Sequence, residues 1–195
     1  MRADRHRLLV ILGRLEMSMR AAVVVVLCTV PAAWAQVGRG AQATETYESA
    51  TIDVKGHLVI VKAGGQVLVR KEGEQTAFSA PVISSARSAV AAQAMFANCC
   101  TSYDIPLQLV VYPGGKTHRF KGVGLPIFQW GFADGGTRIA YGQEPVHSAC
   151  ATHYELRDIE SERLIEAVDV PQPCGQIPDP SPVTIPDWVA RLAGK

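Results

Sequence analysis

Short runs of β-forming residues that alternate with glycine-containing turns dominate residues 52–168. In the first pair, residues 58–61 and 67–69 flank Ala63-Gly64-Gly65-Gln66. Gly-Gly between two β-branched runs predicts a tight hairpin, because a type I′ turn needs positive φ at both central residues. Two further pairs flank glycine-containing turns, 107–112 with 117–120 and 127–132 with 138–141, and a fourth pair, 154–159 with 163–168, flanks Glu160-Ser161-Glu162. The pattern predicts an all-β fold, an antiparallel meander of hairpins that forms a propeller-like or curved sheet or a sandwich.

The segment from Ser84 to Phe96 is rich in alanine, and its propensity alone would favour a helix. An internal repeat instead favours a turn followed by a strand. Residues 83–91 align with 132–140 at an offset of 49, and residues 109–120 align with 155–166 at an offset of 46. Each unit then contains two hairpins joined by a loop with cysteine. A period in the forties with four strands is typical of a propeller blade.

The stretch Phe132-Ala133-Asp134-Gly135-Gly136-Thr137-Arg138-Ile139-Ala140-Tyr141 runs from an aromatic residue through an Asp-Gly turn to an apolar strand with a terminal aromatic. It resembles the WD-like repeat of TolB-like β-propellers, mainly over residues 128–141 and more distantly over 78–168. Ser85-Ala86-Arg87 departs from the Asp-Gly turn in the first unit. The resemblance implies a binding scaffold and carries no catalytic residues. The chain has room for about three blades, whereas closed propellers usually have at least four. A partial propeller, a curved sheet and a sandwich therefore stay open.

Residues 17–35 have the layout of a secretory signal peptide. Arg20 precedes an apolar run that Pro31 ends, and Ala33-Trp34-Ala35 offers small residues before a cut at Gln36. Residues 1–16 fit this layout poorly, so we expect translation to start at Met17 or Met19. The run is shorter than the roughly 20 residues of a membrane-spanning helix, so we expect no stable span after cleavage. We predict a periplasmic or extracellular protein.

The mature chain divides by composition into three parts. Residues 36–47 form a small, polar, flexible lead, and residues 48–170 form the β-rich domain. Residues 171–195 form a proline-rich strap and a short terminal helix, in which Ile185, Trp188 and Leu192 fall near one face. We expect Trp188 to dock on the β-rich domain, with a partner-binding motif as the alternative.

The charge of the mature chain is nearly balanced. Five of the 19 basic and two of the 18 acidic residues precede Gln36, which leaves 14 basic and 16 acidic residues. Because no basic face stands out, nucleic acid is not an expected partner. An unknown protein or envelope ligand is the expected partner class.

Four cysteines follow the signal segment: Cys99, Cys100, Cys150 and Cys174. An even number in an exported chain predicts structural disulfides. The repeat places Cys99 and Cys100 in one loop and Cys150 in the equivalent loop of the next unit, which predicts a bond from one of the adjacent pair to Cys150. The leftover cysteine would hold Cys174. A ring between Cys99 and Cys100 is the rarer alternative, since it departs from ordinary disulfide geometry.

A metal site is the competing interpretation of the same region. His147, Cys150 and His153 have the spacing H-x2-C-x2-H, and imidazole with thiolate suits zinc or copper. That spacing is helical, however, whereas this segment is predicted as a loop leading into a strand. The sequence therefore predicts no metal and no cofactor.

The remaining reactive residues have ordinary structural interpretations. Carboxylates, serines and glycines that we considered for catalysis or phosphate binding match no catalytic motif; they are Asp104, Glu144, Glu155, Asp158, Ser84, Ser85, Ser148, and Gly114-Gly115-Lys116. Phe128, Trp130 and Phe132 alternate along one predicted strand and are expected to pack in the core, as are Tyr141 and Tyr154.

These observations favour an exported, non-enzymatic binding or scaffold domain, with no catalytic residue assigned. The alternative is an exported metal-binding or thiol-redox protein that uses Cys99, Cys100, His147, Cys150 and His153.

Overall fold

The computed structural model describes residues 45–100, 102–147, 150–172 and 184–194. Every described element belongs to one compact unit of the chain, Ala41–Lys195. The predicted signal segment, most of the predicted lead and Cys174 lie outside the described residues.

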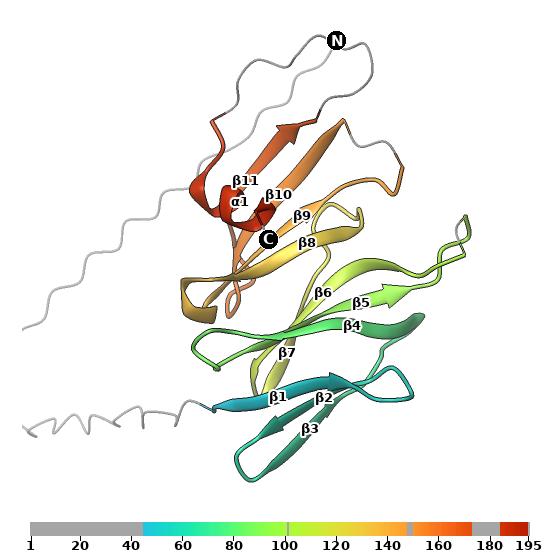
Figure 1. The fold of residues 1–195 in the computed structure, drawn as a ribbon, viewed down its shortest axis with the longest axis vertical. Coiled ribbons are helices and arrows are strands. Elements are labelled where there is room, and N and C mark those ends of the chain that lie inside the picture. The colour runs from blue at the N-terminus through green and yellow to red at the C-terminus, as the bar shows by residue number, and fades with distance from the viewer. Residues whose placement is uncertain (1–44, 101, 148–149, 173–183, 195) are drawn as a thin grey trace, which may run out of the picture. The chain divides into compact units, whose positions relative to one another are not determined.

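Within the described residues, strands form three antiparallel sheets (Figure 1). The first sheet contains β1 (Tyr47–Ile52), β2 (Leu58–Lys62) and β3 (Gly65–Val69). The second contains β4 (Gln75–Ile83), β5 (Val90–Phe96), β6 (Ile105–Gly114) and β7 (Lys116–Phe120). The third contains β8 (Ile127–Ala133), β9 (Arg138–Gln143), β10 (Ala151–Asp158) and β11 (Leu164–Pro171). A 3-10 turn, η1 (Asp134–Gly136), joins β8 to β9, and helix α1 (Asp187–Ala193) follows near the C-terminus.

Neighbours in the chain are neighbours in each sheet, so all three sheets are meanders. The all-β prediction is confirmed, and the four predicted hairpins form as β2–β3, β6–β7, β8–β9 and β10–β11. The predicted type I′ turn at Gly64-Gly65 is wrong. Lys62 pairs with Gly65, so the central residues are Ala63 and Gly64, and of these only Gly64 has positive φ, at 83°. One glycine at the second central position is typical of a type II turn.

The alanine-rich segment is strand β5, as predicted, and its composition follows from its place in the fold. Val90, Ala92 and Ala94 face the first sheet, whereas Ala91 faces the third. All four side chains are fully buried. A strand covered on both faces gains from small side chains that let two sheets pack close to it, and this packing overrides the helix propensity of alanine.

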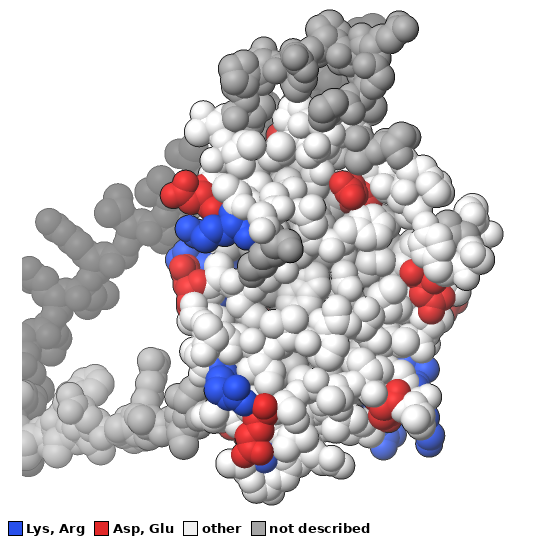
Figure 2. Space-filling model, in the orientation of Figure 1, with Lys and Arg blue, Asp and Glu red and all other residues white. Residues whose placement is uncertain are grey.

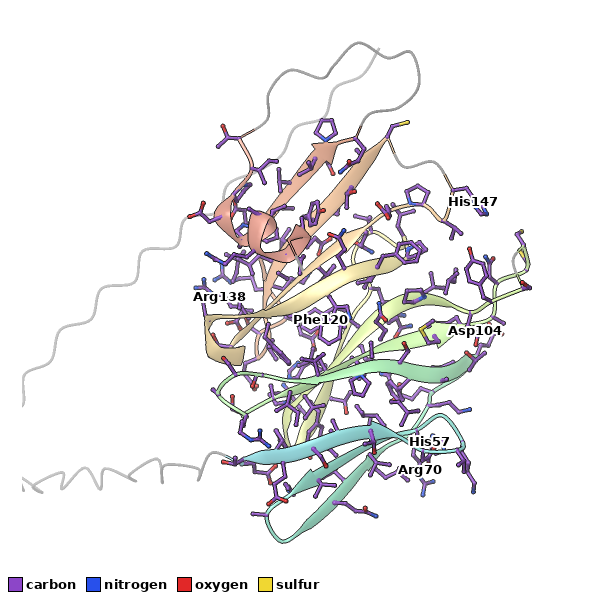
Figure 3. All side chains as sticks on the ribbon, viewed as in Figure 1. His57, Arg70, Asp104, Phe120, Arg138 and His147 are labelled. Carbon is purple, nitrogen blue, oxygen red and sulfur yellow. The ribbon has the colours of Figure 1, made fainter. Side chains whose placement is uncertain are left out.

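Two apolar layers lie between the three sheets. Leu58 and Ile60 of β2 pack with Phe78 and Val110 between the first and second sheets. Leu109 and Phe120 of the second sheet pack with Ile127, Ile139 and Tyr141 of the third. Figure 3 shows Phe120 between these two sheets. Full burial of one such side chain contributes about 2 kcal/mol to folding.

Helix α1 covers the remaining face of the third sheet. Trp188, Val189 and Leu192 pack against Tyr154 and Leu156. The Trp188 ring meets the Tyr154 ring edge-on at 6.5 Å, and its Nε1 donates a hydrogen bond of 2.8 Å to Glu166 Oε2. The predicted docking of Trp188 is confirmed. Ile185 does not share this face; it precedes the helix and is 48% exposed.

Two sequence predictions about aromatic residues are corrected. Tyr47 was placed in the flexible lead, yet it begins β1, is fully buried and packs edge-on against Tyr112 at 5.9 Å. Phe128 was expected in the core beside Trp130 and Phe132, yet it is 41% exposed. The register shifts between Ile127 and Gln129, so a β-bulge at Phe128 breaks the alternation of side chains.

Candidate functional site

A groove opens at the end of the second and third sheets where four connections between strands converge. It has a volume of about 760 Å³. Its lining comes from the segment before β1, the β4–β5 turn, the β6–β7 turn, the β8–β9 turn and the β10–β11 turn: Glu45, Ser88, Pro113, Gly114, Gly115, Gly136, Thr137, Asp158, Ile159 and Glu160. We call this the turn groove. In Figure 3, Arg138 lies at this end, and His147 and Asp104 lie at the opposite end.

Gly114, Gly115 and Gly136 belong to the lining of the turn groove. Gly115 and Gly136 have φ values of 75° and 108°, which residues with a side chain rarely adopt. A Cβ on Gly136 would lie 2.6 Å from the Ser84 Cβ, so no larger residue fits against the β4–β5 turn. The Ser84 hydroxyl oxygen accepts hydrogen bonds of 3.1 Å from the backbone N–H groups of Ser88 and Ala89, which holds that turn closed.

Three carboxylates line the turn groove, and each has a partner. Glu45 forms an ion pair with Lys62, and this hydrogen bond lowers the pKa of Glu45. Asp158 Oδ1 accepts bonds from the Ser161 hydroxyl at 2.6 Å and the Ser161 N–H at 2.9 Å, which lower its pKa. The third, Glu160, has its Oε1 3.5 Å from Lys116 Nζ. No lysine or arginine belongs to the described lining. Beside its carboxylates, the lining contains the hydroxyl residues Ser88 and Thr137 and the apolar residues Pro113 and Ile159.

A buried histidine attaches the β10–β11 turn to the second sheet. The His118 side chain on β7 is fully buried, and its Nδ1 lies 2.9 Å from Glu162 Oε1. Its Nε2 has no hydrogen-bond partner among the described residues and lies 3.7 Å from Glu160 Oε2. This contact links the β10–β11 turn, which carries Glu160, to strand β7 of the second sheet.

A second polar cluster centres on the buried carboxylate of Glu155 in β10. Glu155 Oε2 accepts hydrogen bonds from the Tyr141 hydroxyl at 2.6 Å and from Arg157 Nε at 2.5 Å. Its Oε1 lies 3.3 Å from His153 Nε2, and His153 Nδ1 lies 2.6 Å from Asp169 Oδ1. Burial opposes ionisation of Glu155, but the hydrogen bonds from Arg157 and Tyr141 outweigh it and lower its pKa. Burial, with the neighbouring Glu155, raises the pKa of Tyr141.

This cluster forms because residues of one strand alternate in direction. His153, Glu155 and Arg157 project on one face of β10, and Tyr141 stands opposite Glu155 on β9. All three hydrogen-bonding neighbours are directed at one carboxylate, so Glu155 serves to hold the strands together. The arrangement is structural, and a substrate would have to displace these partners to reach it.

The structure does not assemble the predicted metal candidates. His147 is exposed in the β9–β10 loop, whereas His153 lies in β10 with both ring nitrogens against carboxylates. Cys150 is disulfide-bonded. Among the described residues, no group of three or more His, Cys, Asp or Glu side chains is placed to hold a metal ion. A spacing of three residues brings side chains to one face of a helix but to opposite faces of a strand. Because β10 is a strand, the spacing does not gather these residues into a metal site.

Neither disulfide predicted for the adjacent cysteine pair, one to Cys150 and one to Cys174, is formed. Cys99 and Cys100 are free, exposed thiols in the β5–β6 loop, with their Sγ atoms 2.8 Å apart. They belong to the second sheet, whereas Cys150 directly precedes β10 of the third. The β5–β6 and β9–β10 loops occupy corresponding places in two different sheets, but this correspondence does not bring their cysteines into a bond.

The carboxylates considered for a catalytic dyad lie in separate contacts. Asp104 Oδ2 accepts a bond of 2.5 Å from the Thr76 hydroxyl, and Glu144 Oε2 one of 3.1 Å from the Thr152 hydroxyl. Glu155 and Asp158 have the partners given above. Gly114 and Gly115 belong to the predicted hairpin turn between β6 and β7, and Ser148 lies outside the described residues.

The sequence did not reveal the turn groove. Its residues come from turns that are up to 72 positions apart along the chain between Ser88 and Glu160. The one available signal was the repeat alignment, which pairs the β4–β5 turn with the β8–β9 turn at an offset of 49 and the β6–β7 turn with the β10–β11 turn at an offset of 46.

Charges on the described surface are mixed. On the face shown in Figure 2, acidic and basic side chains lie in small neighbouring groups around the margin, with an uncharged centre. No helix in the described part of the chain is both long and apolar enough to cross a bilayer. Comparison with protein-family models, curated proteins and solved structures found no match to this chain.

Proposed function

We propose that this chain is an exported binding or scaffold domain whose ligand, a protein or another component of the envelope, binds at the turn groove. The observation that carries the proposal is the convergence of the hairpin turns of two sheets on one groove of about 760 Å³. Turns held by a rigid sheet scaffold commonly carry binding residues. The signal-like segment at residues 17–35 supports export to the periplasm or the exterior.

The chemistry of the turn groove favours a polar ligand that donates hydrogen bonds. Its glycines leave backbone groups accessible, and the carboxylates of Glu45, Asp158 and Glu160 add acceptors. The partial neutralisation of Glu45 by Lys62 and of Glu160 by Lys116 lessens the attraction for a cation. A peptide backbone or a hydroxyl-rich group meets these requirements.

The stacking of successive meanders supports a propeller-like or WD-like scaffold for this binding function. The second and third sheets each contain four strands in chain order, and each contributes two hairpin turns to the groove. The equivalent β5–β6 and β9–β10 loops contain Cys99, Cys100 and Cys150. In this proposal, each meander acts as one blade of an open stack.

Site-specific photo-crosslinking in the expressing cell tests the proposal. A photoreactive amino acid replaces Thr137 in the turn groove, and a matched variant carries it at Thr51 on β1, which is also an exposed threonine. We expect a discrete adduct from position 137 and none from position 51, on a secreted product that begins at Gln36. Equal adducts at both positions, or none at position 137, would contradict binding at the groove.

Intact mass of the native protein tests the alternative function, in which the chain binds metal or performs thiol redox chemistry. The free thiols of Cys99 and Cys100 favour only the thiol part of this alternative. A stoichiometric zinc or copper adduct would instead support the metal part.

A further inference from the structure

The β5–β6 loop carries two adjacent thiols at the end of the sheets opposite the turn groove. Cys99 and Cys100 are both exposed, and their sulfurs are 2.8 Å apart. The covalent S–S bond is about 2.05 Å long, so the two sulfurs lie within hydrogen-bonding contact but are not bonded. The Cys100 N–H donates a bond of 3.3 Å to Asn98 Oδ1, which fixes the backbone at the second cysteine.

The structure leaves each of these thiols only the other as an intramolecular partner among the described residues. Cys150 is disulfide-bonded, and the remaining described cysteines are Cys99 and Cys100 themselves. A solvent-exposed thiol pair with no other free thiol in the described part of the chain is the arrangement in which oxidation proceeds within the pair.

We propose that Cys99 and Cys100 form a reversible two-electron thiol site that closes to a vicinal disulfide when hydrogen peroxide oxidises it. The Cys99 thiolate attacks one peroxide oxygen, the O–O bond breaks, and the leaving oxygen departs as water after protonation. The Cys99 sulfenic acid is then attacked by the Cys100 sulfur, which loses its proton, and the sulfenic oxygen leaves as a second water. The peroxide is reduced by two electrons and the thiol pair is oxidised by two.

The contact between the sulfurs sets the order of these steps. The hydrogen bond with Cys99 raises the pKa of Cys100. The raised pKa disfavours the thiolate form of Cys100, and the sulfur contact holds the Cys100 S–H group next to the sulfur that it later attacks. Cys99 is the attacking thiol and Cys100 the resolving thiol. This site is independent of the turn groove and would function whether or not the groove binds a ligand.

Mass spectrometry of the purified mature protein tests the proposal, after mild reduction that leaves the Cys150 disulfide closed. With a small excess of hydrogen peroxide, we expect the wild-type protein to lose the mass of two hydrogens. Peptide mapping should place the new bond between residues 99 and 100, and a thiol reductant should restore the original mass. Cys100→Ser should instead accumulate a Cys99 sulfenic acid that dimedone traps, and Cys99→Ser should react at least several-fold more slowly.

Phenylarsine oxide gives a second readout that needs no oxidation. Trivalent arsenicals bridge two thiols that lie close together, so the wild-type protein should bind one equivalent and each single serine variant should bind it far more weakly. Oxidation of the wild type to sulfinic acids or to intermolecular dimers, at the rate of the single variants, would overturn the proposal. Equal arsenical binding by wild type and variants would overturn it as well.

Discussion

Replacement of Glu155 by glutamine is expected to destabilise the fold by about 3 kcal/mol. The carboxylate accepts bonds from Tyr141 and Arg157 at 2.6 and 2.5 Å and is almost fully buried. Removing one partner of a buried ion pair costs about 3–5 kcal/mol, and a hydrogen bond to a charged group contributes about 1.5–3 kcal/mol. Glutamine keeps one acceptor oxygen, and Arg157 keeps its bond of 3.0 Å to the Glu162 carbonyl oxygen. We therefore take the lower end of the range for a broken ion pair, about 3 kcal/mol.

Thermal and urea unfolding followed by circular dichroism measure this effect. A domain of this size loses roughly 2–4 °C of Tm per kcal/mol, so Glu155→Gln should lower Tm by roughly 6–12 °C. Glu74→Gln is the matched control, because Glu74 is exposed in the β3–β4 connection and should change stability by less than about 0.5 kcal/mol. If Glu155→Gln lowers the free energy of unfolding by less than about 1 kcal/mol, the proposal that the hydrogen bonds of this carboxylate stabilise the fold is refuted.

The same variant makes a prediction about pH. The pKa of Glu155 is lower in the folded protein than its ordinary value. Its ionised form therefore stabilises the fold above the unfolded-state pKa of about 4.3, and this contribution disappears as pH falls through the folded-state pKa. The difference in unfolding free energy between wild type and Glu155→Gln should be full at neutral pH and should shrink below about pH 4. A difference independent of pH would contradict the ionised state.

Three further variants test individual contacts by urea unfolding. Gly122→Ala should cost more than about 2 kcal/mol, because its φ is +53° and the new Cβ would lie 1.9 Å from Gln143 Oε1; a neutral result would show that Gln143 does not hold this loop. Trp188→Ala should cost about 3 kcal/mol through lost packing and the lost bond to Glu166; an unchanged free energy of unfolding would favour the partner-binding role of α1. Ser84→Ala should cost about 1 kcal/mol, and no loss would mean that its two backbone bonds are not required for the turn.

The hairpins show how much of the fold was predictable. Turn residues act locally, so Gly114 and Gly115, or Asp134 and Gly135, identify a reversal without knowledge of the rest of the chain. The position of the turn within a hairpin was less certain, because Lys62 pairs with Gly65 and displaces the predicted centre by one residue. The register between β2 and β3 sets the position of the turn, and this register depends on the residues of both strands.

The candidate sites were less predictable than the fold. The spacing of His147, Cys150 and His153 indicated a metal site only if the segment were helical, and its strand conformation directs His153 to Glu155 and Asp169 instead. The pairing of Cys99 or Cys100 with Cys150 assumed that equivalent loops touch. Whether two loops touch depends on the distance between their sheets. The spacing of residues along the sequence does not give this distance.

The sequence by itself determined the class of this protein, because β-branched runs separated by glycine turns can satisfy their backbone hydrogen bonds only as antiparallel hairpins. It also placed strand β5 and helix α1 and selected Trp188 as the helix residue that docks. Tertiary structure alone decided that Tyr47 is a core residue, that a bulge exposes Phe128, and that distant turns meet at one groove. The physical reason is that turn chemistry acts over a few neighbouring residues, whereas burial and the convergence of loops arise only when sheets pack against each other.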